Sequence, residues 1–552
     1  MERRSFLKAA AASTAAAMVF GRRGALAQQA SSHIEVLVEE PIATIAPEIY
    51  GHFTEHLGSV VYDGIYVGEN SKIPNQQGLR TALIEKMRAI EAPVVRWPGG
   101  CFADSYDWRD GIGPKDKRPR HTNFWVDDFK PEQKKQNIPQ IYDPNAFGTD
   151  DFVRFCKLSG AEPYFAANVR SLPALEFDHW VEYCNSPRGT TTLAETRAAA
   201  GSPDPYNVRY WGVGNESWGC GGNFDPEDYA VEFKRYTTWV PSYGVGLRFI
   251  ASGPNSDEQA WTRRFFEKLY RGQPANDGRG VWGLSIHHYD MNVTRGKSAD
   301  WQGKGEALNF DRTEWYESVK ESDRMEGIIL EHWNALGEWD LSHKIKLVAD
   351  EYGPWYLKGT EYAPEELYSQ AITMRDALVT GLTLDTFNRQ ADKVGMAACA
   401  QLINCLNALF MSHEDKFTTT PVFNIFEIYA AHQGGTALRT EFSAPEVHYD
   451  RDGKPASVWG LRGSASLKGK TLTLTAVNPD TREPRETEIV LRGARAASAK
   501  AWVVAESDIH AHNTLGQPEQ VKTRAAEVAV RPGSLSFTFP PASVVKIEAQ
   551  LS

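Results

Sequence analysis

The sequence is poor in three features that would point to particular classes of protein. Only six of its 552 residues are cysteine, and no pair has the C-x-x-C spacing that suggests a zinc site. After residue 30, no segment contains the eighteen or more apolar residues that a membrane-spanning helix needs. Lysine and arginine number 60 against 71 acidic residues. Such a chain binds polyanions poorly, so we expect neither nucleic acid nor a membrane as a partner, and neutral or cationic ligands instead.

The first thirty residues have the pattern of an export signal. Arg3 and Arg4 come before an alanine-rich apolar stretch, and an Ala-Leu-Ala site ends at residue 27. A frayed basic helix is the alternative, but it gives no reason for these features to occur in this order. The pattern resembles a twin-arginine signal, so we expect residues 1–27 to be an export signal and the protein to be periplasmic or secreted. The remaining chain has 55 basic and 70 acidic residues, a formal charge of −15.

Between residues 46 and 435, short apolar runs alternate with longer helical patterns. Such alternation is typical of βαβ units and a parallel sheet. An amphipathic pattern over residues 78–92, for example, predicts a helix between the first two runs. The runs begin near residues 48, 93, 163, 208, 248, 283, 345 and 398. Eight strands with helices between them predict a (β/α)₈ barrel, the α/β fold also known as the TIM barrel.

The chain after residue 435 has a different pattern. Short alternating strands are separated by Gly, Pro and Asn-Pro, which predicts an antiparallel, jelly-roll-like β-sandwich over residues 436–552. A lone strand, HIEVLVEE, lies near residue 33 and before the barrel. We expect the segment 28–45 to contribute this strand to the sandwich.

The carboxyl end of each barrel run carries polar residues, and this is where barrel enzymes place their working groups. In chain order these residues are Glu55 with His56, Arg96, Asn168, Asn215 with Glu216, Asn255, His287 with His288 and Tyr289, Asp350 with Glu351, and Gln401 with Asn404. Glu216 follows the fourth run and Glu351 the seventh, and these strands face each other across the mouth of a barrel. Two facing carboxylates are what glycosidic bond cleavage requires, and a separation of ~5–5.5 Å would give a retaining mechanism.

The neighbours of the two glutamates suggest how they divide the work. Arg96 can hold Glu351 ionised as a nucleophile, and Asn215 can hydrogen-bond a sugar hydroxyl beside the reacting carbon. Glu216 must then be the protonated acid that later becomes the base. Taken singly, an Asn-Glu pair arises by chance and a buried Arg-Glu pair is often structural. Together, in barrel register, these residues favour catalysis.

Five segments along the chain carry a family pattern. They are IYGHFTEHLG (49–58), VVRWPGGCFADSYDWRDGIGP (94–114), YWGVGNESWGCGG (210–222), SIHHYD (285–290) and VADEYGPWY (348–356). They resemble the α-L-arabinofuranosidases of glycoside hydrolase family 51, in the barrel clan A. The R-W-P-G-G…W-x-D-G-x-G-P run is highly specific, and the resemblance spans nearly the whole chain after the signal.

The resemblance implies a role for each candidate residue. Glu216 matches the acid/base and Glu351 the nucleophile of a retaining enzyme that uses no metal or other cofactor for its chemistry. The substrate-binding residues would be Arg96, Cys101 and, for the furanose hydroxyls, Glu55, Asn215 and Gln401, with His287, Tyr289 and Trp355 shaping the pocket. The family fold is a barrel with a β-sandwich that takes its first strand from the N-terminus, and the family resemblance favours a homo-oligomer, a hexamer.

Two positions depart from the family pattern. Cys101 stands where many members have Asn, which is expected to place a thiol near the sugar. Tyr352 follows the nucleophile where Trp is commoner, and with Pro354 it is expected to reshape the leaving-group side.

The sequence therefore predicts an exported, exo-acting α-L-arabinofuranosidase that removes terminal residues from arabinose-containing plant glycans. A β-xylosidase or endo-glucanase of the same clan is the nearest alternative, because the two-glutamate machinery is shared. A noncatalytic glycan-binding protein is the remote alternative, but it would not need a second carboxylate across the barrel mouth.

Overall fold

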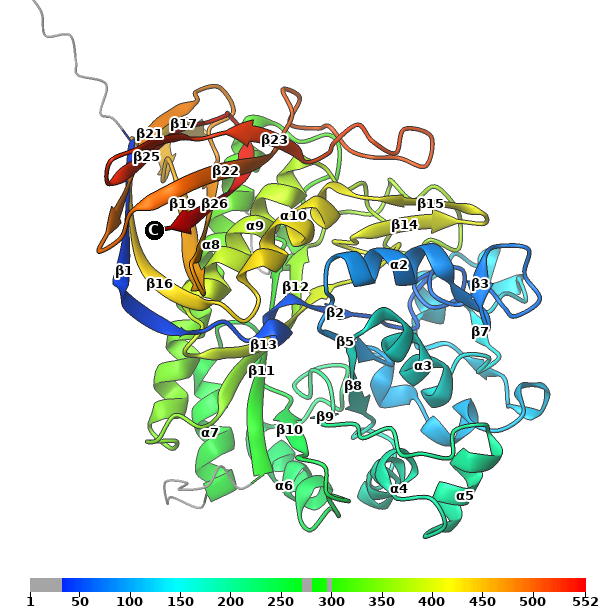
Figure 1. Ribbon diagram of the computed structural model, residues 1–552. Helices are drawn as coiled ribbons and strands as arrows, with labels where there is room; N and C mark the ends of the chain where they lie inside the picture. Colours follow the sequence, from blue (N-terminus) through cyan, green and yellow to red (C-terminus); the bar gives the residue numbers. More distant parts are fainter. Residues whose placement is uncertain (1–31, 271–279, 295–299) are drawn as a thin grey trace, which may run out of the picture.

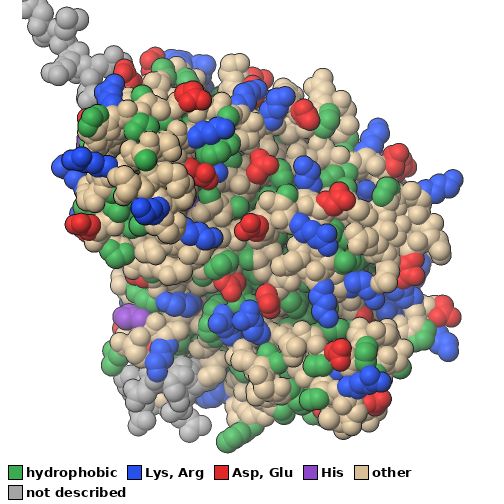
Figure 2. Space-filling view, in the orientation of Figure 1, with side chains coloured by type: hydrophobic (Ala, Val, Ile, Leu, Met, Phe, Trp, Pro, Cys, Tyr) green, Lys and Arg blue, Asp and Glu red, His purple; other side chains and the backbone are tan. Residues whose placement is uncertain are grey.

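The computed structural model of the protein describes residues 32–270, 280–294 and 300–552, and the expected export signal lies outside these residues. A closed parallel barrel and a rolled ten-stranded sheet lie side by side (Figure 1). Among the helices of the described ranges, none is long and apolar enough to cross a membrane. Basic and acidic side chains are interspersed over the face drawn in Figure 2.

The barrel contains one strand from each of the eight apolar runs, which confirms the predicted (β/α)₈ fold. Around the barrel the strands follow the order β10-β11-β12-β13-β2-β5-β8-β9, so the last strand, β13, closes against the first, β2. Their bounds are β2 (Gly51–Phe53), β5 (Val94–Trp97), β8 (Glu162–Ala167), β9 (Tyr210–Val213), β10 (Arg248–Ala251), β11 (Val281–Asp290), β12 (Lys346–Pro354) and β13 (Val394–Ala400). Because all neighbouring pairs are parallel, every strand delivers its carboxyl end to the same mouth.

Helices follow the strands and cover the outside of the barrel. They are α2 (Thr81–Ala89), α3 (Thr149–Ser159), α4 (Ala174–Asn185), α5 (Thr192–Ala199), α6 (Pro226–Thr237), α7 (Gln259–Tyr270), α8 (Arg312–Gly337), α9 (Met374–Arg389) and α10 (Pro421–Tyr429). The helix expected over residues 78–92 is α2, which buries Leu83, Ile84 and Met87 against the barrel. Proline at the first position and acidic residues in the first turn favour the start of α6.

Helix α9 joins the two parts of the molecule. It begins with a capping box in which Thr373 and Asp376 satisfy each other's backbone N–H groups. It packs against β12 on one side and against the rolled sheet on the other, so nearly all of its side chains are buried. Asp385 on α9 accepts hydrogen bonds from Tyr429 of α10 (2.8 Å) and from Ser464 of the sheet (2.7 Å). These bonds satisfy a buried carboxylate and fix the sheet against the barrel.

The rolled sheet has the order β23-β22-β26-β20-β19-β16-β1-β21-β25-β24. Its strands are β1 (Ser32–Thr44), β16 (Thr436–Ser443), β19 (Arg462–Lys468), β20 (Thr471–Asn478), β21 (Arg485–Arg492), β22 (Ala496–Ala505), β23 (Arg524–Glu527), β24 (Ala529–Arg531), β25 (Ser534–Phe539) and β26 (Ser543–Leu551). Contacts of β22 with β24 and β25 bring the two halves together around an apolar core that includes Ile34, Leu474 and Ile547. This is the predicted strand-rich domain, with its strand from the N-terminus.

One pairing in this sheet differs from the antiparallel prediction. Strand β1 is antiparallel to β16 but parallel to β21, with Ser32 opposite Thr487. The physical reason is geometric: β16 and β21 run in opposite directions, so a strand inserted between them must be parallel to one of them.

In the described residues, four small two-stranded sheets lie outside the two large ones. They pair β3 (Asn75–Gln76) with β4 (Leu79–Arg80), β6 (His121–Thr122) with β7 (Tyr142–Asp143), β14 (Phe410–His413) with β15 (Lys416–Thr419), and β17 (Val447–Arg451) with β18 (Lys454–Val458). The β14–β15 hairpin belongs to the segment after β13, at the mouth of the barrel.

Candidate active site

The two candidate catalytic glutamates meet at the mouth of the barrel. Glu216 lies just after β9, and Glu351 lies in β12 near its carboxyl end. An oxygen of each carboxylate and a ring nitrogen of His287 all lie within 4.8 Å of one another. This is close to the roughly 5–5.5 Å between the carboxyl groups of retaining glycosidases, and well below the roughly 6.5–9.5 Å of inverting ones. The geometry therefore suits double displacement.

Glu351 is held by two strong donors. The guanidinium of Arg96, on β5, donates to Glu351 Oε1 at 2.7 Å, and the hydroxyl of Tyr289, on β11, donates to Oε2 at 2.8 Å. Burial lowers the pKa of Arg96, but the negative charges of Asp350 and Glu351 outweigh burial and raise it, so the guanidinium stays charged. Burial and the charge of Glu351 both raise the pKa of Tyr289, which keeps its proton for this hydrogen bond. A buried carboxylate with both oxygens bonded in this way is suited to act as a nucleophile.

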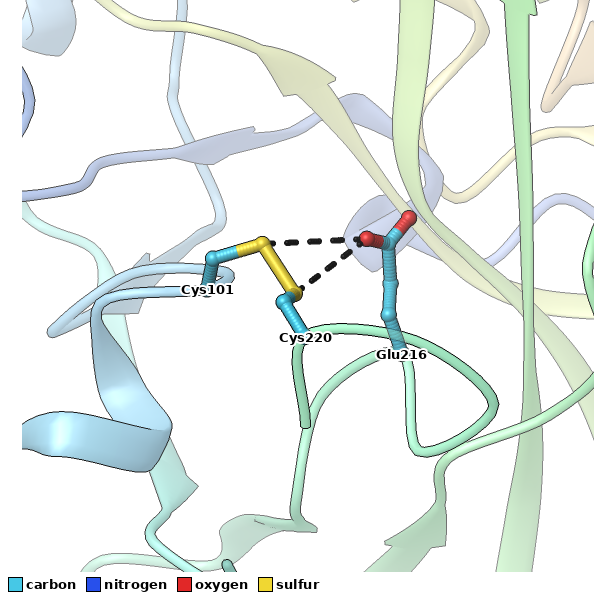
Figure 3. A group of neighbouring side chains, drawn as sticks. All are labelled: Cys101, Glu216 and Cys220. Atoms are coloured by element: carbon cyan, nitrogen blue, oxygen red, sulfur yellow. Dashed lines mark hydrogen bonds between the residues drawn. A yellow bond between two sulfur atoms is a disulfide. The ribbon is translucent and has the colours of Figure 1, made fainter. Parts of the chain in front are cut away.

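Glu216 has a different environment, dominated by a disulfide. Cys101, after β5, is bonded to Cys220, and their sulfurs lie 3.9 and 3.6 Å from Glu216 Oε2 (Figure 3). Because a disulfide sulfur carries no hydrogen, these are packing contacts in which the sulfurs donate nothing to the carboxylate. The expectation of a free thiol at Cys101 is wrong, since oxidation has consumed it.

Sequence reasoning did not find Cys220 as the partner of Cys101. The two cysteines are 119 residues apart, but each lies in the loop that follows a barrel strand, β5 or β9, and each has glycine beside it. Parallel barrel strands deliver these loops to one face of the molecule. That shared position was the signal that could have suggested the pair.

His287, on β11, lies between the carboxylates. Its Nδ1 is 3.1 Å from Glu216 Oε1 and 3.7 Å from Glu351 Oε2, and its Nε2 is 3.2 Å from Asp350 Oδ1. Burial lowers the pKa of His287, but the charges and hydrogen bonds of these three carboxylates outweigh burial and raise it to about 10. The imidazolium therefore donates from both ring nitrogens at neutral pH.

Asp350 lies beneath the reacting carboxylates and supports them, a role that the sequence did not reveal. It accepts from the Tyr164 hydroxyl at 2.7 Å, and Arg96 Nε lies 3.4 Å from it. Burial alone would raise its pKa, but Arg96 and His287 hold the pKa well below the usual range for aspartate. A permanently ionised Asp350 anchors both cations that contact the glutamates. Its position directly before Glu351 was the signal available in the sequence.

Asn215 is oriented by its neighbours. Arg96 Nη2 donates to its Oδ1 at 2.6 Å, and its backbone N–H donates to Asp104 Oδ2 at 3.1 Å. Because Oδ1 is already engaged, the amide Nδ2 remains as the group that can donate to a ligand. Burial raises the pKa of Asp104 to about 7. Asp104 thus supports Asn215 from behind, a role that sequence reasoning missed.

Glu55 and Gln401 lie on the side of the barrel mouth opposite Asn215. Glu55 Oε1 accepts from the Phe102 N–H at 2.9 Å, and Gln401 Nε2 donates to Glu55 Oε2 at 3.3 Å. Burial and the charge of Glu351 raise the pKa of Glu55 to about 7. The buried Oε1 of Gln401 accepts no hydrogen bond from the residues that the structure describes, which leaves it for a ligand hydroxyl.

The Gly-Gly step after β5 allows these carboxylates to crowd together. A Cβ on Gly99 would lie 2.5 Å from Glu55 Cγ, and one on Gly100 would lie 2.8 Å from Glu351 Oε1. Gly99 also has a φ of 159°, which L side chains rarely adopt. Only glycine fits at either position, which explains this part of the R-W-P-G-G run.

Two aromatic residues after Glu351 have different positions. The ring of Trp355 stands edge-on to Tyr289 with 5.2 Å between centroids, and Lys304 Nζ lies 3.7 Å from the centre of the Trp355 ring. Trp355 therefore lies beside Tyr289 at the edge of the site. Tyr352 is 1% exposed and packs on Phe387 of α9, so the expectation that it reshapes the leaving-group side is wrong. The pairing of β12 with β13 is irregular between Ala349 and Tyr352, so Asp350 and Glu351 both face the site while Tyr352 packs on α9.

The structure thus brings all ten candidate residues to one end of the barrel. An eight-stranded parallel barrel with two close carboxylates at its mouth, one held by arginine and tyrosine and the other beside histidine, defines a glycoside hydrolase.

Comparison with known proteins identifies the family. Residues 86–295 match the α-L-arabinofuranosidase 1 domain, and residues 350–543 match the α-L-arabinofuranosidase C-terminal domain. A Bacteroides ovatus protein described as an intracellular exo-α-L-arabinofuranosidase is 34% identical over 95% of this chain and 97% of its own. An Emericella nidulans α-L-arabinofuranosidase C is 27% identical over 80% and 82% of the two chains. The chain belongs to glycoside hydrolase family 51, the α-L-arabinofuranosidases.

Solved structures agree with this assignment. The family 51 arabinofuranosidase of Xanthomonas axonopodis pv. citri superimposes with a TM-score of 0.86 at 31% identity, covering 94% of this chain and all of the other. An α-L-arabinofuranosidase of Thermotoga maritima, solved with arabinose, gives a TM-score of 0.76 at 28% identity over 94% of this chain and all of its own.

Proposed function

We propose that the protein is an exo-acting α-L-arabinofuranosidase that releases terminal non-reducing α-L-arabinofuranosyl residues from arabinose-containing plant glycans, with retention of configuration. The observation that carries this proposal is the approach of Glu216 and Glu351 to within 4.8 Å in two unlike environments. The exo mode is supported by the description of the Bacteroides ovatus relative. Family membership disfavours the β-xylosidase and endo-glucanase alternatives, and the paired carboxylates disfavour a noncatalytic glycan-binding protein.

In the first step Glu351 attacks the anomeric carbon while Glu216 protonates the departing glycosidic oxygen. Arg96 and Tyr289 fix the attacking carboxylate. Glu216 Oε1 already accepts from His287, so the proton for the leaving group is carried on Oε2, the oxygen beside the disulfide. The C–O bond breaks, and a covalent glycosyl-enzyme forms on Glu351.

In the second step Glu216, now ionised, removes a proton from water as the water attacks the anomeric carbon. Glu351 departs as a carboxylate and recovers its bonds to Arg96 and Tyr289. Before the first step Glu351 carries the charge and Glu216 the proton, whereas in the intermediate the esterified Glu351 carries no charge. The ionised Glu216 replaces that charge, so the charge around His287 is balanced through the cycle.

The remaining candidate residues bind the sugar. Asn215 Nδ2 donates to the hydroxyl beside the reacting carbon, and Glu55 with Gln401 holds hydroxyls on the opposite wall. Asn215 Nδ2, Glu55 Oε2 and Gln401 Oε1 can each bond a sugar hydroxyl, which supports these roles. Trp355 covers the apolar face of the sugar or of the leaving group, as its place beside Tyr289 suggests.

Export through residues 1–27 remains part of the proposal, with the protein periplasmic or secreted. The Cys101–Cys220 disulfide supports it, since disulfides persist in oxidising compartments. The Bacteroides ovatus relative is described as intracellular, which makes the question an experimental one. Fractionation of the native host, with N-terminal sequencing of the purified protein, should find a chain that starts at Gln28 outside the cytoplasm. An intact N-terminus in the cytoplasm would overturn export.

We also propose that the protein is a homo-oligomer, a hexamer by family resemblance. Light scattering of the purified chain after size-exclusion chromatography should give about six times the chain mass. A monomeric mass would contradict this.

The activity is tested by offering aryl α-L-arabinofuranoside, aryl β-D-xyloside and an unsubstituted β-glucan to the purified enzyme. We expect turnover of the arabinofuranoside, with NMR showing that the first product has the α configuration. Cleavage of only the xyloside or the glucan would leave the carboxylate roles standing and overturn the sugar. A β product would overturn retention.

A further inference from the structure

A second cluster of ligand-type side chains lies at the mouth of the barrel, apart from the catalytic pair. Asp63 belongs to the loop after β2, Glu366 to the loop between β12 and α9, and His413 is the last residue of β14. One oxygen or nitrogen atom from each of the three lies within 4.8 Å of the others. His413 Nδ1 is 3.8 Å from Glu366 Oε1. Three loops that are distant in sequence therefore converge on one point.

The carboxylate of Glu366 is the unusual member of this cluster. Its side chain is fully buried, and neither oxygen accepts a hydrogen bond from any residue in the described parts of the chain. The hydroxyls nearby direct their protons elsewhere: Tyr362 donates to the Ser412 carbonyl at 2.8 Å, and Ser59 donates to the Glu365 carbonyl at 3.2 Å. A carboxylate taken out of water without donors is costly, so a buried carboxyl group either keeps its proton or is paired with a positive group.

In the part of the chain that the structure describes, few positive side chains contact these carboxylates. Arg80 is directed at Asp63, with 3.3 Å between Nη2 and Oδ1, and its remaining hydrogen bonds go to backbone carbonyls. His413 lies 3.6 Å from a second carboxylate, Glu365. Three carboxylates thus face one guanidinium and one imidazole. Carboxylates and imidazoles are side chains that coordinate metal ions, and Asp63, Glu366 and His413 lie close enough together to share one.

We propose that Asp63, Glu366 and His413 bind a divalent transition-metal ion of the Zn²⁺ type. Two carboxylate oxygens and an imidazole nitrogen suit such an ion better than Mg²⁺ or Ca²⁺, which prefer oxygen ligands alone. The ion supplies two positive charges at the buried Glu366 carboxylate. A cavity of about 450 Å³, lined by Lys358, Tyr362 and Glu366 among others, reaches one of the three ligands, Glu366.

The ion would stabilise the barrel mouth and take no part in the chemistry. It joins the loops that follow β2, β12 and β13, and the loop after β12 begins with Trp355, beside Tyr289. Its removal should therefore loosen three loops around the active site while leaving Glu216 and Glu351 intact. The inference stands whether or not the proposed sugar specificity is right.

The test is zinc binding by the full chain after treatment with EDTA and dialysis. Isothermal titration with ZnCl₂, zinc content after gel filtration and thermal melting should show one ion per chain and a higher Tm with zinc. Glu366→Gln and His413→Gln should weaken binding by more than the roughly 10–100-fold that loss of an outer-shell partner causes, and should abolish the Tm shift. Glu414→Gln, an exposed neighbour of His413, is the matched control and should bind as the wild type does.

Two further measurements exclude misfolding of the variants and zinc binding at the catalytic residues as explanations. Glu366→Gln preserves side-chain volume and removes a buried charge, so its zinc-free Tm should equal or exceed that of the wild type. Glu351→Ala should bind zinc normally, because Glu216, His287 and Glu351 form another group in which zinc could lodge, while the third such group in the described residues contains the Cys101–Cys220 disulfide. Absence of zinc binding, wild-type affinity in both Glu366→Gln and His413→Gln, or loss of binding in Glu351→Ala would each overturn the proposal.

Discussion

The two sides of the active site hold the same side chain in opposite ways. Glu351 is 7% exposed and has a donor on each oxygen, Arg96 at 2.7 Å and Tyr289 at 2.8 Å. Glu216 is 19% exposed and has one donor, His287, on Oε1, while Oε2 packs against the Cys101–Cys220 disulfide, which donates nothing. The difference shows how a pair of glutamates is given two roles: donors hold both oxygens of Glu351 in place, whereas Oε2 of Glu216 has no donor among the described residues.

The largest effect should come from removing the nucleophile side. Glu351→Ala should lower kcat/KM on an aryl α-L-arabinofuranoside by roughly 10⁴-fold or more, because no other group can form the covalent intermediate. Steady-state kinetics, with a melting curve to show that the variant is folded, measures this. A loss below about tenfold would show that Glu351 does not attack.

Removal of the acid/base should have an effect that depends on the leaving group. Glu216→Ala should cost about 10²–10⁴-fold on natural arabino-oligosaccharides, and much less on an activated aryl glycoside whose leaving group needs no proton. Azide should restore turnover of the activated substrate by attacking the glycosyl-enzyme without base assistance. Equal losses on both substrates and no response to azide would contradict the role assigned to Glu216.

The donors on Glu351 can be tested one at a time. Tyr289→Phe removes one hydrogen bond to a charged group, worth about 1.5–3 kcal/mol, so kcat/KM should fall about 10–100-fold. Tyr164→Phe is the matched control, since the Tyr164 hydroxyl donates to Asp350 and does not touch Glu351. We expect a smaller loss in Tyr164→Phe. Equal losses would mean that the donor on Glu351 has no special importance.

The disulfide beside Glu216 can be tested by replacing its cysteines with residues that do or do not donate hydrogen bonds. The double variant Cys101→Ser/Cys220→Ser places hydroxyl donors beside Oε2, while Cys101→Ala/Cys220→Ala removes the disulfide without adding donors. Donors favour the ionised form of Glu216, so the serine variant should lose activity at lower pH than the alanine variant on the alkaline side of the profile. Both should lose about 2–5 kcal/mol of stability with the disulfide. Identical pH profiles would show that the disulfide acts only through stability.

Much of this arrangement is readable from the sequence because barrel topology is regular. Eight apolar runs separated by helical patterns predict the barrel, and the polar residue at each run's end predicts Glu216, Glu351 and Arg96 at one mouth. The limits of the domains and the export signal stay predictions.

The contacts that the sequence did not reveal depend on loops and on buried layers. The Cys101–Cys220 pair forms between two loops 119 residues apart, whose approach no local pattern encodes. Asp104 and Asp350 act from behind the candidate residues, through hydrogen bonds to Asn215 and His287. No sequence pattern marks such supporting residues, because any buried hydrogen-bond acceptor within reach of Asn215 or His287 would serve.

The last prediction concerns the stability of the fold and His287, the residue shared by both sides. Its pKa is raised to about 10 in the folded state, above the roughly 6.5 of an unfolded chain, so its stabilising contribution is complete below pH 6.5 and is lost as pH rises toward 10. The free energy of unfolding of the wild type should therefore fall more steeply from pH 6.5 to 9.5 than that of His287→Gln. Urea titrations across this range measure both slopes. Parallel slopes would mean that His287 is neutral, and that Glu216 Oε1 and Asp350 share no cation.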